Sequence, residues 1–218
     1  LSFGNTTFVF LLFTFLMTYA LEQTPALRRF VARALGSSFA GKSPWHFIGA
    51  FYPSVLAISL FISPTILFMI VFPIYEEIMA VLGLKKGDRE ASVLLIALFA
   101  TVAIGTAMTP INHVFSVTAM ALYKNATGIA ISNAQYMMIG IPAGLVLFIA
   151  MGVVLRTIWR VDLSTVEMKP LESLEALPAK SKRETATDLN FMRDVLLWVL
   201  PELVGGFIPD AADYLKTA

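Results

Sequence analysis

The chain has 218 residues, of which 57% are hydrophobic and 14% are charged, and its mean hydropathy is +0.76. These values are typical of membrane proteins rather than of soluble globular domains. A formal net charge of +1 argues against a nucleic-acid-binding surface, and the absence of cysteine excludes disulfides, zinc–thiolate sites and cysteine nucleophiles. Because the sequence begins with Leu and ends shortly after an apolar patch, we expect a longer protein with a segment missing at least on the C-terminal side.

The first predicted element is a transmembrane helix within residues 1–24, where an apolar run reaches the ~17 residues at the short end of the spanning range. Residues 25–45 follow as a basic amphipathic segment, which we expect on the cytoplasmic face of the membrane. Within this segment apolar residues recur at helical spacing opposite three arginines. The apolar side comprises Leu27, Phe30, Val31, Ala34 and Leu35, and the basic side comprises Arg28, Arg29 and Arg33.

Residues 46–84 contain a long uncharged run that a Ser-Pro-Thr sequence interrupts at Pro64. Proline lacks an amide hydrogen and disfavours helical geometry at the preceding residue, so the run is divided there. Two structures fit this pattern: one kinked, tilted helix, or a hairpin that enters and leaves the membrane by the same face. Basic residues mark the cytoplasmic side, and they flank the run at both Lys42 and Lys85. We therefore favour a re-entrant hairpin.

A second long uncharged run lies within residues 90–123 and is also interrupted near its middle. Gly105 and Pro110 both oppose a continuous helix. The far end of the run carries only Lys124, in a polar loop that suits the outside of the membrane. We predict one broken transmembrane helix, made of two half-helices joined by an unwound linker. Polar side chains surround the interruption at Thr106, Thr109 and Asn112.

Residues 134–160 form the third apolar run and the most regular predicted transmembrane helix. Gly140 and Gly144 are four positions apart, which makes a small-xxx-small face for close packing against a neighbouring helix. Arg156 and Arg160 follow the run beside Trp159, so the chain is expected to return to the cytoplasm there.

The remaining chain is more polar. Residues 161–190 carry mixed charges and two prolines, and we expect a cytoplasmic linker without a fixed core. Residues 191–218 are predicted to form an interfacial helix or the start of a further span. The fold class predicted is thus an all-α integral membrane protein with one re-entrant hairpin and one broken helix. Residues 25–45, 85–90 and 160–190 would face the cytoplasm.

The two interruptions form the candidate binding region. In lipid, irregular backbone persists only where it is buried in protein or lines a cavity. Broken helices leave free carbonyls, which suit a cation such as Na⁺, and free amides, which suit a carboxylate or another oxyanion. Paired breaks of this kind are typical of transporter sites. The alternative is that the Ser and Thr hydroxyls bond to their own backbone or join helices.

Enzymatic activity is not expected. The apolar runs contain no nucleophile–base pair for hydrolysis. Glu76 and Glu77 are adjacent carboxylates, but basic residues follow them, which favours a solvated interface over proton coupling. His113 could carry a proton, although a lone membrane histidine is more often a packing residue.

Three stretches give the chain a likeness to a known family. They are residues 62–73 (ISPTILFMIVFP), 103–112 (AIGTAMTPIN) and 131–142 (ISNAQYMMIGIP). In order, they resemble the hairpin tip, the unwound linker and the entry to the next helix in the divalent anion/sodium symporters of the ion-transporter superfamily. The likeness covers roughly residues 7–160 and corresponds to the N-terminal half, one of two inverted repeats.

The resemblance implies a secondary active transporter for a small organic or inorganic anion, such as a di- or tricarboxylate, coupled to Na⁺. It implies that Ser59, Ser63 and the Gly105 backbone hold the Na⁺ ion and that Thr65 faces the substrate carboxylate. The partners implied are the lipid bilayer, a C-terminal repeat of the same protein and a second copy in a homodimer, in a bacterial inner membrane. The candidate substrate-binding residues are Thr65, Thr106, Thr109 and Asn112.

One residue departs from the family pattern. Pro64 stands where the family has an asparagine, which removes a side-chain ligand. Two alternatives therefore stay open: a transport-inactive structural or partner subunit, and a proton-coupled permease of the same superfamily.

Overall fold

The computed structural model describes residues 24–111, 113–163 and most of 181–193, with a few single residues between 9 and 19. This part of the chain is all-α, as predicted, and contains no strand. The predicted elements at 1–24 and 191–218 lie almost entirely outside the described residues. In chain order the elements are α2 (Ala26–Leu35), a short 3-10 helix (Ala40–Lys42), α3 (Pro44–Ser59), α4 (Pro64–Val81), α5 (Arg89–Met108), α6 (Val114–Thr127) and α7 (Asn133–Thr157).

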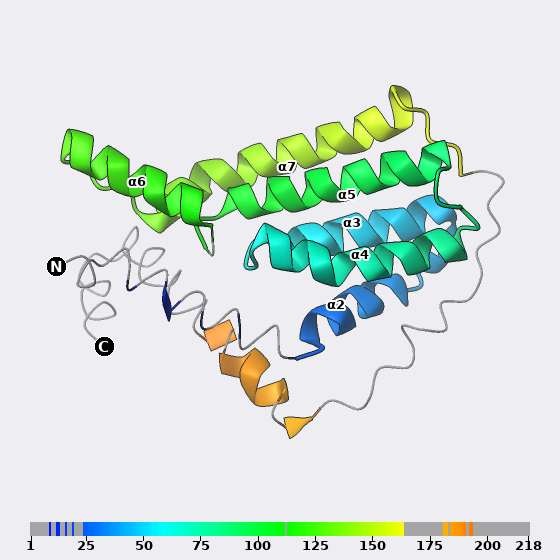
Figure 1. Cartoon of the computed structure of the whole chain (residues 1–218), viewed down its shortest axis with the longest axis horizontal. Coiled ribbons are helices and arrows are strands. Elements are labelled where there is room, and N and C mark those ends of the chain that lie inside the picture. The colour runs from blue at the N-terminus through cyan, green and yellow to red at the C-terminus, as the bar shows by residue number, and fades with distance from the viewer. Residues whose placement is uncertain are drawn as a thin grey trace.

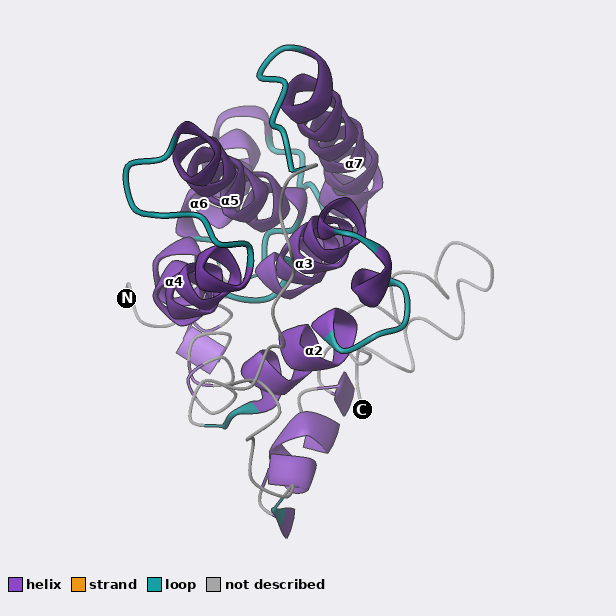
Figure 2. Cartoon of the chain, turned by 90° about the vertical axis from the view of Figure 1, so that its right-hand side faces the viewer, coloured by secondary structure: helices purple, strands orange, loops and turns teal. Residues whose placement is uncertain are grey.

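Three of these helices, α4, α5 and α7, are long and apolar enough to cross a membrane. Figures 1 and 2 show the arrangement: α3 and α4 form a middle layer, α5 and α7 lie on one side of it, and α2 lies on the other. The helix α6 extends beyond the far end of α5 (Figure 1).

The first uncharged run forms a helical hairpin, not one kinked helix. Its arms α3 and α4 are joined by the turn 60–63. Pro64 is the first residue of α4, a position where its missing amide hydrogen costs no helical hydrogen bond. The start of the other arm is also determined by neighbouring residues. The Ser43 side chain caps α3 by accepting a hydrogen bond from the His46 amide. The predicted break at Pro64 is therefore confirmed.

The second run is divided at 109–113, and Pro110 lies in this break. Gly105 does not interrupt the helix, contrary to the sequence-based interpretation, because it lies inside α5 and serves a close helix contact. The 20 residues of α5 extend ~30 Å, which is already the thickness of a hydrocarbon core. The break therefore follows a helix that is by itself long enough to span a membrane. Lys124 is also helical, since α6 continues to Thr127 and ends at Gly128, whose φ is 75°.

The helix α7 begins at a capping box in which Ser132 and Gln135 bond to each other's backbone amides. Its small-residue face makes the predicted close contact. A Cβ atom added to Gly140 would lie 2.6 Å from the Met108 carbonyl oxygen, and one added to Gly144 would lie 2.2 Å from Met108 Cγ. The two glycines therefore allow α7 to approach the end of α5.

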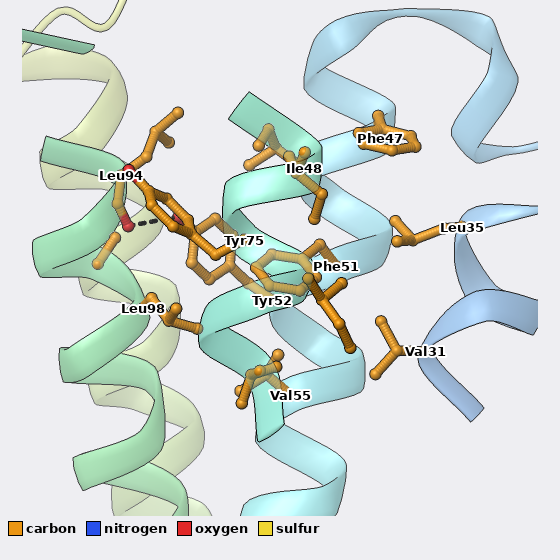
Figure 3. Close-up of a cluster of buried hydrophobic side chains, with 14 of the residues drawn as sticks. Val31, Leu35, Phe47, Ile48, Phe51, Tyr52, Val55, Tyr75, Leu94 and Leu98 are labelled. Carbon is orange, nitrogen blue, oxygen red and sulfur yellow. Dashed lines mark hydrogen bonds between the residues drawn. The ribbon is translucent and has the colours of Figure 1, made fainter. Parts of the chain in front are cut away.

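Two buried tyrosines of the hairpin donate hydrogen bonds to carbonyls of α5 (Figure 3). Tyr52 on α3 donates to the Leu94 carbonyl at 2.7 Å, and Tyr75 on α4 donates to the Ala91 carbonyl. A helical carbonyl can accept a second hydrogen bond because it has two lone pairs. The hairpin arms are thus held at one register along α5, which determines where the hairpin turn lies.

The amphipathic helix α2 packs on α3 with Leu27, Val31 and Leu35 buried, while Phe30 is exposed. Its arginines reach other elements. Arg28 bonds to Glu77 on α4 at 3.1 Å, and Arg29 bonds to the buried Glu184 at 2.6 Å. Residues 184–190 are helical, so this part of the expected linker is packed against α2.

Basic residues collect at one end of the bundle. The start of α3, the loop between α4 and α5, and the end of α7 all lie at this end (Figure 1). Arg89 donates to the Trp159 carbonyl at 2.6 Å, which ties the start of α5 to the end of α7. These segments and the residues next to them in the chain carry Lys42, Lys85, Lys86, Arg89, Arg156 and Arg160. The hairpin turn lies toward the opposite end.

Candidate functional site: the junction of a hairpin turn and a helix break

The hairpin turn and the break after α5 meet at the end of the bundle opposite the basic residues. The hydroxyl of Thr109, in the break, donates to the carbonyl of Leu60, in the turn. Thr109 has an exposed fraction of 1%. We call this region, comprising residues 56–65, 105–111 and 113, the junction. The two interruptions singled out in the sequence are therefore neighbours in space.

A second close contact at the junction is between Ser59 and Gly105. A Cβ atom on Gly105 would lie 1.6 Å from Ser59 Oγ, 2.8 Å from Ser59 Cβ and 3.1 Å from the Leu56 carbonyl oxygen. Only a residue without a side chain fits here. Gly105 thus allows the last turn of α3 to pack closely against α5, and it does not interrupt α5.

Two hydroxyls supply donors to carbonyls near the end of α3. The final carbonyls of a helix have no partner within the helix. Ser59 donates to the Leu56 carbonyl at 2.6 Å, and Thr109 donates to the carbonyl of Leu60, just past the helix end. The carbonyls of Leu56 and Leu60 were not identified from sequence, because no side chain marks a backbone oxygen. The signal that could have found them is the end of α3 itself, which Pro64 defines.

Thr106 fits the alternative in which a hydroxyl in an apolar helix bonds to its own backbone. Its hydroxyl is buried and donates to the Val102 carbonyl at 2.9 Å, within its own helix. It makes no hydrogen bond to the hairpin. Among the candidate substrate-binding residues that the structure describes (Thr65, Thr106 and Thr109), Thr106 is the one whose hydroxyl donates to its own helix.

The start of α4 forms the accessible side of the junction. Ser63 is the N-cap residue, and its side chain makes no capping hydrogen bond. Thr65 is exposed. The first amides of a helix have no intrahelical acceptor, and a helix N-terminus carries partial positive charge. The structure thus separates the candidates: Ser59 and Thr109 are buried, whereas Ser63 and Thr65 lie where the turn opens. Asn112 lies outside the described residues.

A second polar cluster adjoins the break and was missed in the sequence. The Ser116 hydroxyl lies 3.3 Å from His113 Nδ1 and 3.0 Å from the Tyr136 hydroxyl. Tyr136 donates to the Ala107 carbonyl at 2.9 Å. These bonds join the start of α6, the start of α7 and the end of α5. The spacing of 20 positions between Ser116 and Tyr136 gives no local signal for this contact.

The length of α5 bears on the depth at which the junction would lie in a membrane. Gly105 lies sixteen positions after Arg89, which corresponds to ~24 Å along α5. If Arg89 marks the cytoplasmic interface, the junction is in the outer part of a ~30 Å core. With 20 and 14 residues, α5 and α6 would together extend ~50 Å, so they cannot both cross one core upright.

The atoms at the junction that could coordinate a metal ion are uncharged oxygens. Ser59, Thr109 and the carbonyls of Leu56 and Leu60 are hard ligands, which suit a hard cation such as Na⁺. Among the described residues there is no group of three or more His, Cys, Asp or Glu side chains that could hold a metal ion. The residues present therefore fit Na⁺ better than a transition metal.

Comparison of the chain with protein-family models, with curated proteins and with solved structures found no match. The likeness to the divalent anion/sodium symporters consequently depends on the sequence stretches quoted above.

Proposed function

We propose that this chain is the N-terminal repeat of a secondary active transporter that moves a small anion, such as a di- or tricarboxylate, with Na⁺. The observation that carries the proposal is the hydrogen bond from Thr109 to the Leu60 carbonyl. It brings an irregular hairpin turn and an irregular helix break into contact within an otherwise apolar helical bundle. Two such interruptions at one place are typical of transporter binding sites.

The junction offers separate places for the two charges. The Na⁺ ion would be held by Ser59, Ser63 and the Gly105 region, with the Leu56 and Leu60 carbonyls as further oxygens. The bound cation would supply a local positive charge. The anion would bind at the first turn of α4, where Thr65 is exposed and the helix N-terminus favours negative charge. Because Ser63 of the proposed cation site is two positions before Thr65, the charge of a bound Na⁺ would favour anion binding.

The hairpin is proposed to be re-entrant, with both its ends on the cytoplasmic side. Its two ends lie with the basic residues at one end of the bundle (Figure 1), and such residues are typical of cytoplasmic loops. The arms have 16 and 18 residues, so the turn would approach the outer face without a further loop. A C-terminal repeat would cover the exposed side of the turn and complete the site.

An uptake measurement tests the proposal. The full-length protein is reconstituted in liposomes, and uptake of labelled succinate, citrate and sulfate is followed with an inward Na⁺ gradient and with choline in its place. We expect Na⁺-dependent uptake of at least one anion and a reduced rate in Ser63→Ala. The control is Ser54→Ala, because Ser54 is on the same hairpin but bonds to its own Ala50 carbonyl at 2.6 Å.

The result against transport is the absence of uptake in any gradient, together with a Ser63→Ala variant that equals the parent. That result favours a transport-inactive partner subunit, a role with which the self-bonded hydroxyls of Ser59 and Thr106 agree. Uptake that follows a pH gradient and ignores Na⁺ would instead indicate the proton-coupled permease.

A further inference from the structure

A groove of about 360 Å³ opens between α3 and α7 near the basic end of the bundle, remote from the junction. Its wall along α3 includes Ile48 and Tyr52, and its wall along α7 includes Phe148. Most of this surface is apolar and faces outward between two helices of the bundle. Such a surface on a membrane protein is in contact with lipid chains unless protein covers it.

Two glycines line this groove, Gly49 and Gly152, and they differ from the other α-helical glycines among the described residues. A Cβ atom added to Gly152 on α7 would meet nothing within 4 Å, and one added to Gly49 on α3 would meet only Phe39 Cε1 at 3.9 Å. Neither glycine has a positive φ. A glycine inside a helix is unfavourable relative to alanine, so these positions are left open without any gain in helix packing. An open space between two helices could hold a lipid chain.

Cationic and aromatic groups gather at the mouth of the groove. The Arg156 guanidinium lies 4.9 Å from the ring centroid of Trp45. Stacking on a ring uses the face of the guanidinium and leaves its N–H edge for a phosphate or carboxylate. His46 also lines the groove, and Ser43 Oγ lies 2.7 Å from its Nδ1, so Nε2 is the ring nitrogen that remains for a ligand. Among the described residues that line the groove, none is acidic.

We propose that this groove binds an anionic phospholipid, with one acyl chain between α3 and α7 and the phosphate at Arg156 and His46. The eight positions from Phe148 to Arg156 give the chain ~12 Å of helix to follow. An acyl chain has similar surroundings in the bilayer, so the head group decides which lipid is enriched. Basic pockets between helices on the cytoplasmic side are suited to anionic lipid head groups. This inference does not depend on the proposed transport.

Trp45 reports on the groove directly. In a background in which every other tryptophan of the protein, including Trp159 and Trp198, is replaced by phenylalanine, Trp45 reports alone. The protein is placed in phosphatidylcholine bilayers that contain either brominated phosphatidylglycerol or brominated phosphatidylcholine at the same mole fraction, and quenching of Trp45 is measured. We expect about fivefold enrichment of the anionic lipid, the effect of one basic residue near a charged head group. Native mass spectrometry of the unaltered chain in the same lipid mixture gives a second measurement.

Three variants make the test specific. Arg156→Gln should abolish the preference for phosphatidylglycerol, whereas Lys86→Gln, an exposed charge at the same end of the bundle, should retain it. Gly152→Leu should fill the groove without a backbone clash and reduce quenching by both lipids. The proposal is overturned if both lipids quench the parent equally and bind equally in the mass spectrometer. It is also overturned if Arg156→Gln keeps the preference or Gly152→Leu leaves quenching unchanged.

Discussion

Two helices of almost equal apolar character, α5 and α7, have very different surroundings. Their most apolar windows have mean hydropathies of 2.2 and 2.5, yet 50% of the α5 window is buried inside the protein and only 11% of the α7 window. Lipid and protein interiors are similarly apolar, so composition cannot distinguish a helix that faces one from a helix that faces the other. What distinguishes them is contact geometry, and glycine is the residue that reports it most clearly here.

The glycines of these two helices fall into two groups, close-packed and open, and α7 contains both. The space where a Gly105 side chain would lie is occupied by Ser59 of α3. The corresponding space at Gly140, near the start of α7, is occupied by the Met108 carbonyl. Gly152, farther along α7, has open space. Substitution by alanine should therefore change the free energy of unfolding by a different amount at each position.

The largest effect is expected at the junction. Gly105→Ala places a methyl group against Ser59 and the Leu56 carbonyl, so the hairpin must move away from α5. Overpacking of this kind costs ~1–3 kcal/mol, and we expect the upper part of that range because Cβ and backbone atoms are involved. The free energy of unfolding is measured by denaturant titration in mixed micelles.

Gly152→Ala is the matched control for this change. It adds the same methyl group to a helix interior in open space, where helix propensity favours alanine by ~1 kcal/mol. Equal destabilisation of the two variants would contradict the distinction between the buried face of α5 and the open face of α7.

A comparison within α7 sharpens the same point. Gly140→Ala meets a backbone oxygen at 2.6 Å, which can move only with the end of α5. Gly144→Ala meets Met108 Cγ and Sδ, which belong to a flexible side chain. We expect Gly140→Ala to cost ~1–3 kcal/mol and Gly144→Ala less. The same titration compares them, and a larger loss at Gly144 would show that α7 does not approach Met108 as described.

The next effect concerns two threonines at the end of α5. Thr109→Val removes the donor to the part-buried Leu60 carbonyl, and loss of such a hydrogen bond costs ~0.5–1.5 kcal/mol. Thr106→Val removes only a second bond to a helical carbonyl and should cost well under ~1 kcal/mol. The difference between these two unfolding free energies measures the link between turn and break. Equal losses would show that the link contributes nothing.

The smallest effect is expected on α2. Arg28→Gln removes an ion pair with Glu77 in which both side chains are partly exposed, at 42% and 29%. Exposed pairs of this type contribute ~0–1 kcal/mol, so the stability should barely change. The unfolding titration repeated at high salt provides the check, since a screened surface pair should lose its remaining contribution there.

The helices were largely predictable because their signals are local. Charged residues bound the apolar runs, Pro64 and Pro110 mark the interruptions, and Gly140 and Gly144 mark a packing face. The arginine stripe on α2 was likewise visible as an amphipathic pattern. Each of these features depends on residues within a few turns of one another, which a sequence displays directly.

The contacts of the candidate site were less predictable because they join distant residues or involve the backbone. Gly105 was interpreted as a helix breaker, since a glycine that permits packing and one that interrupts a helix look alike in sequence. The oxygens of Leu56 and Leu60 belong to apolar residues, and the pairing of Arg29 with Glu184 spans 155 positions. The full length of α5, and with it the position of the break beyond that helix, also needed the structure.

The most direct test of the junction is its response to Na⁺ alone. Thr65→Cys and, as a control one turn farther along the exposed side of α4, Met69→Cys are labelled with a membrane-impermeant maleimide in proteoliposomes of the full-length protein. We predict that replacing choline by Na⁺ changes the labelling rate at Thr65→Cys and leaves that at Met69→Cys unchanged. Identical rates in Na⁺ and choline at both positions would contradict a Na⁺ site at the hairpin turn.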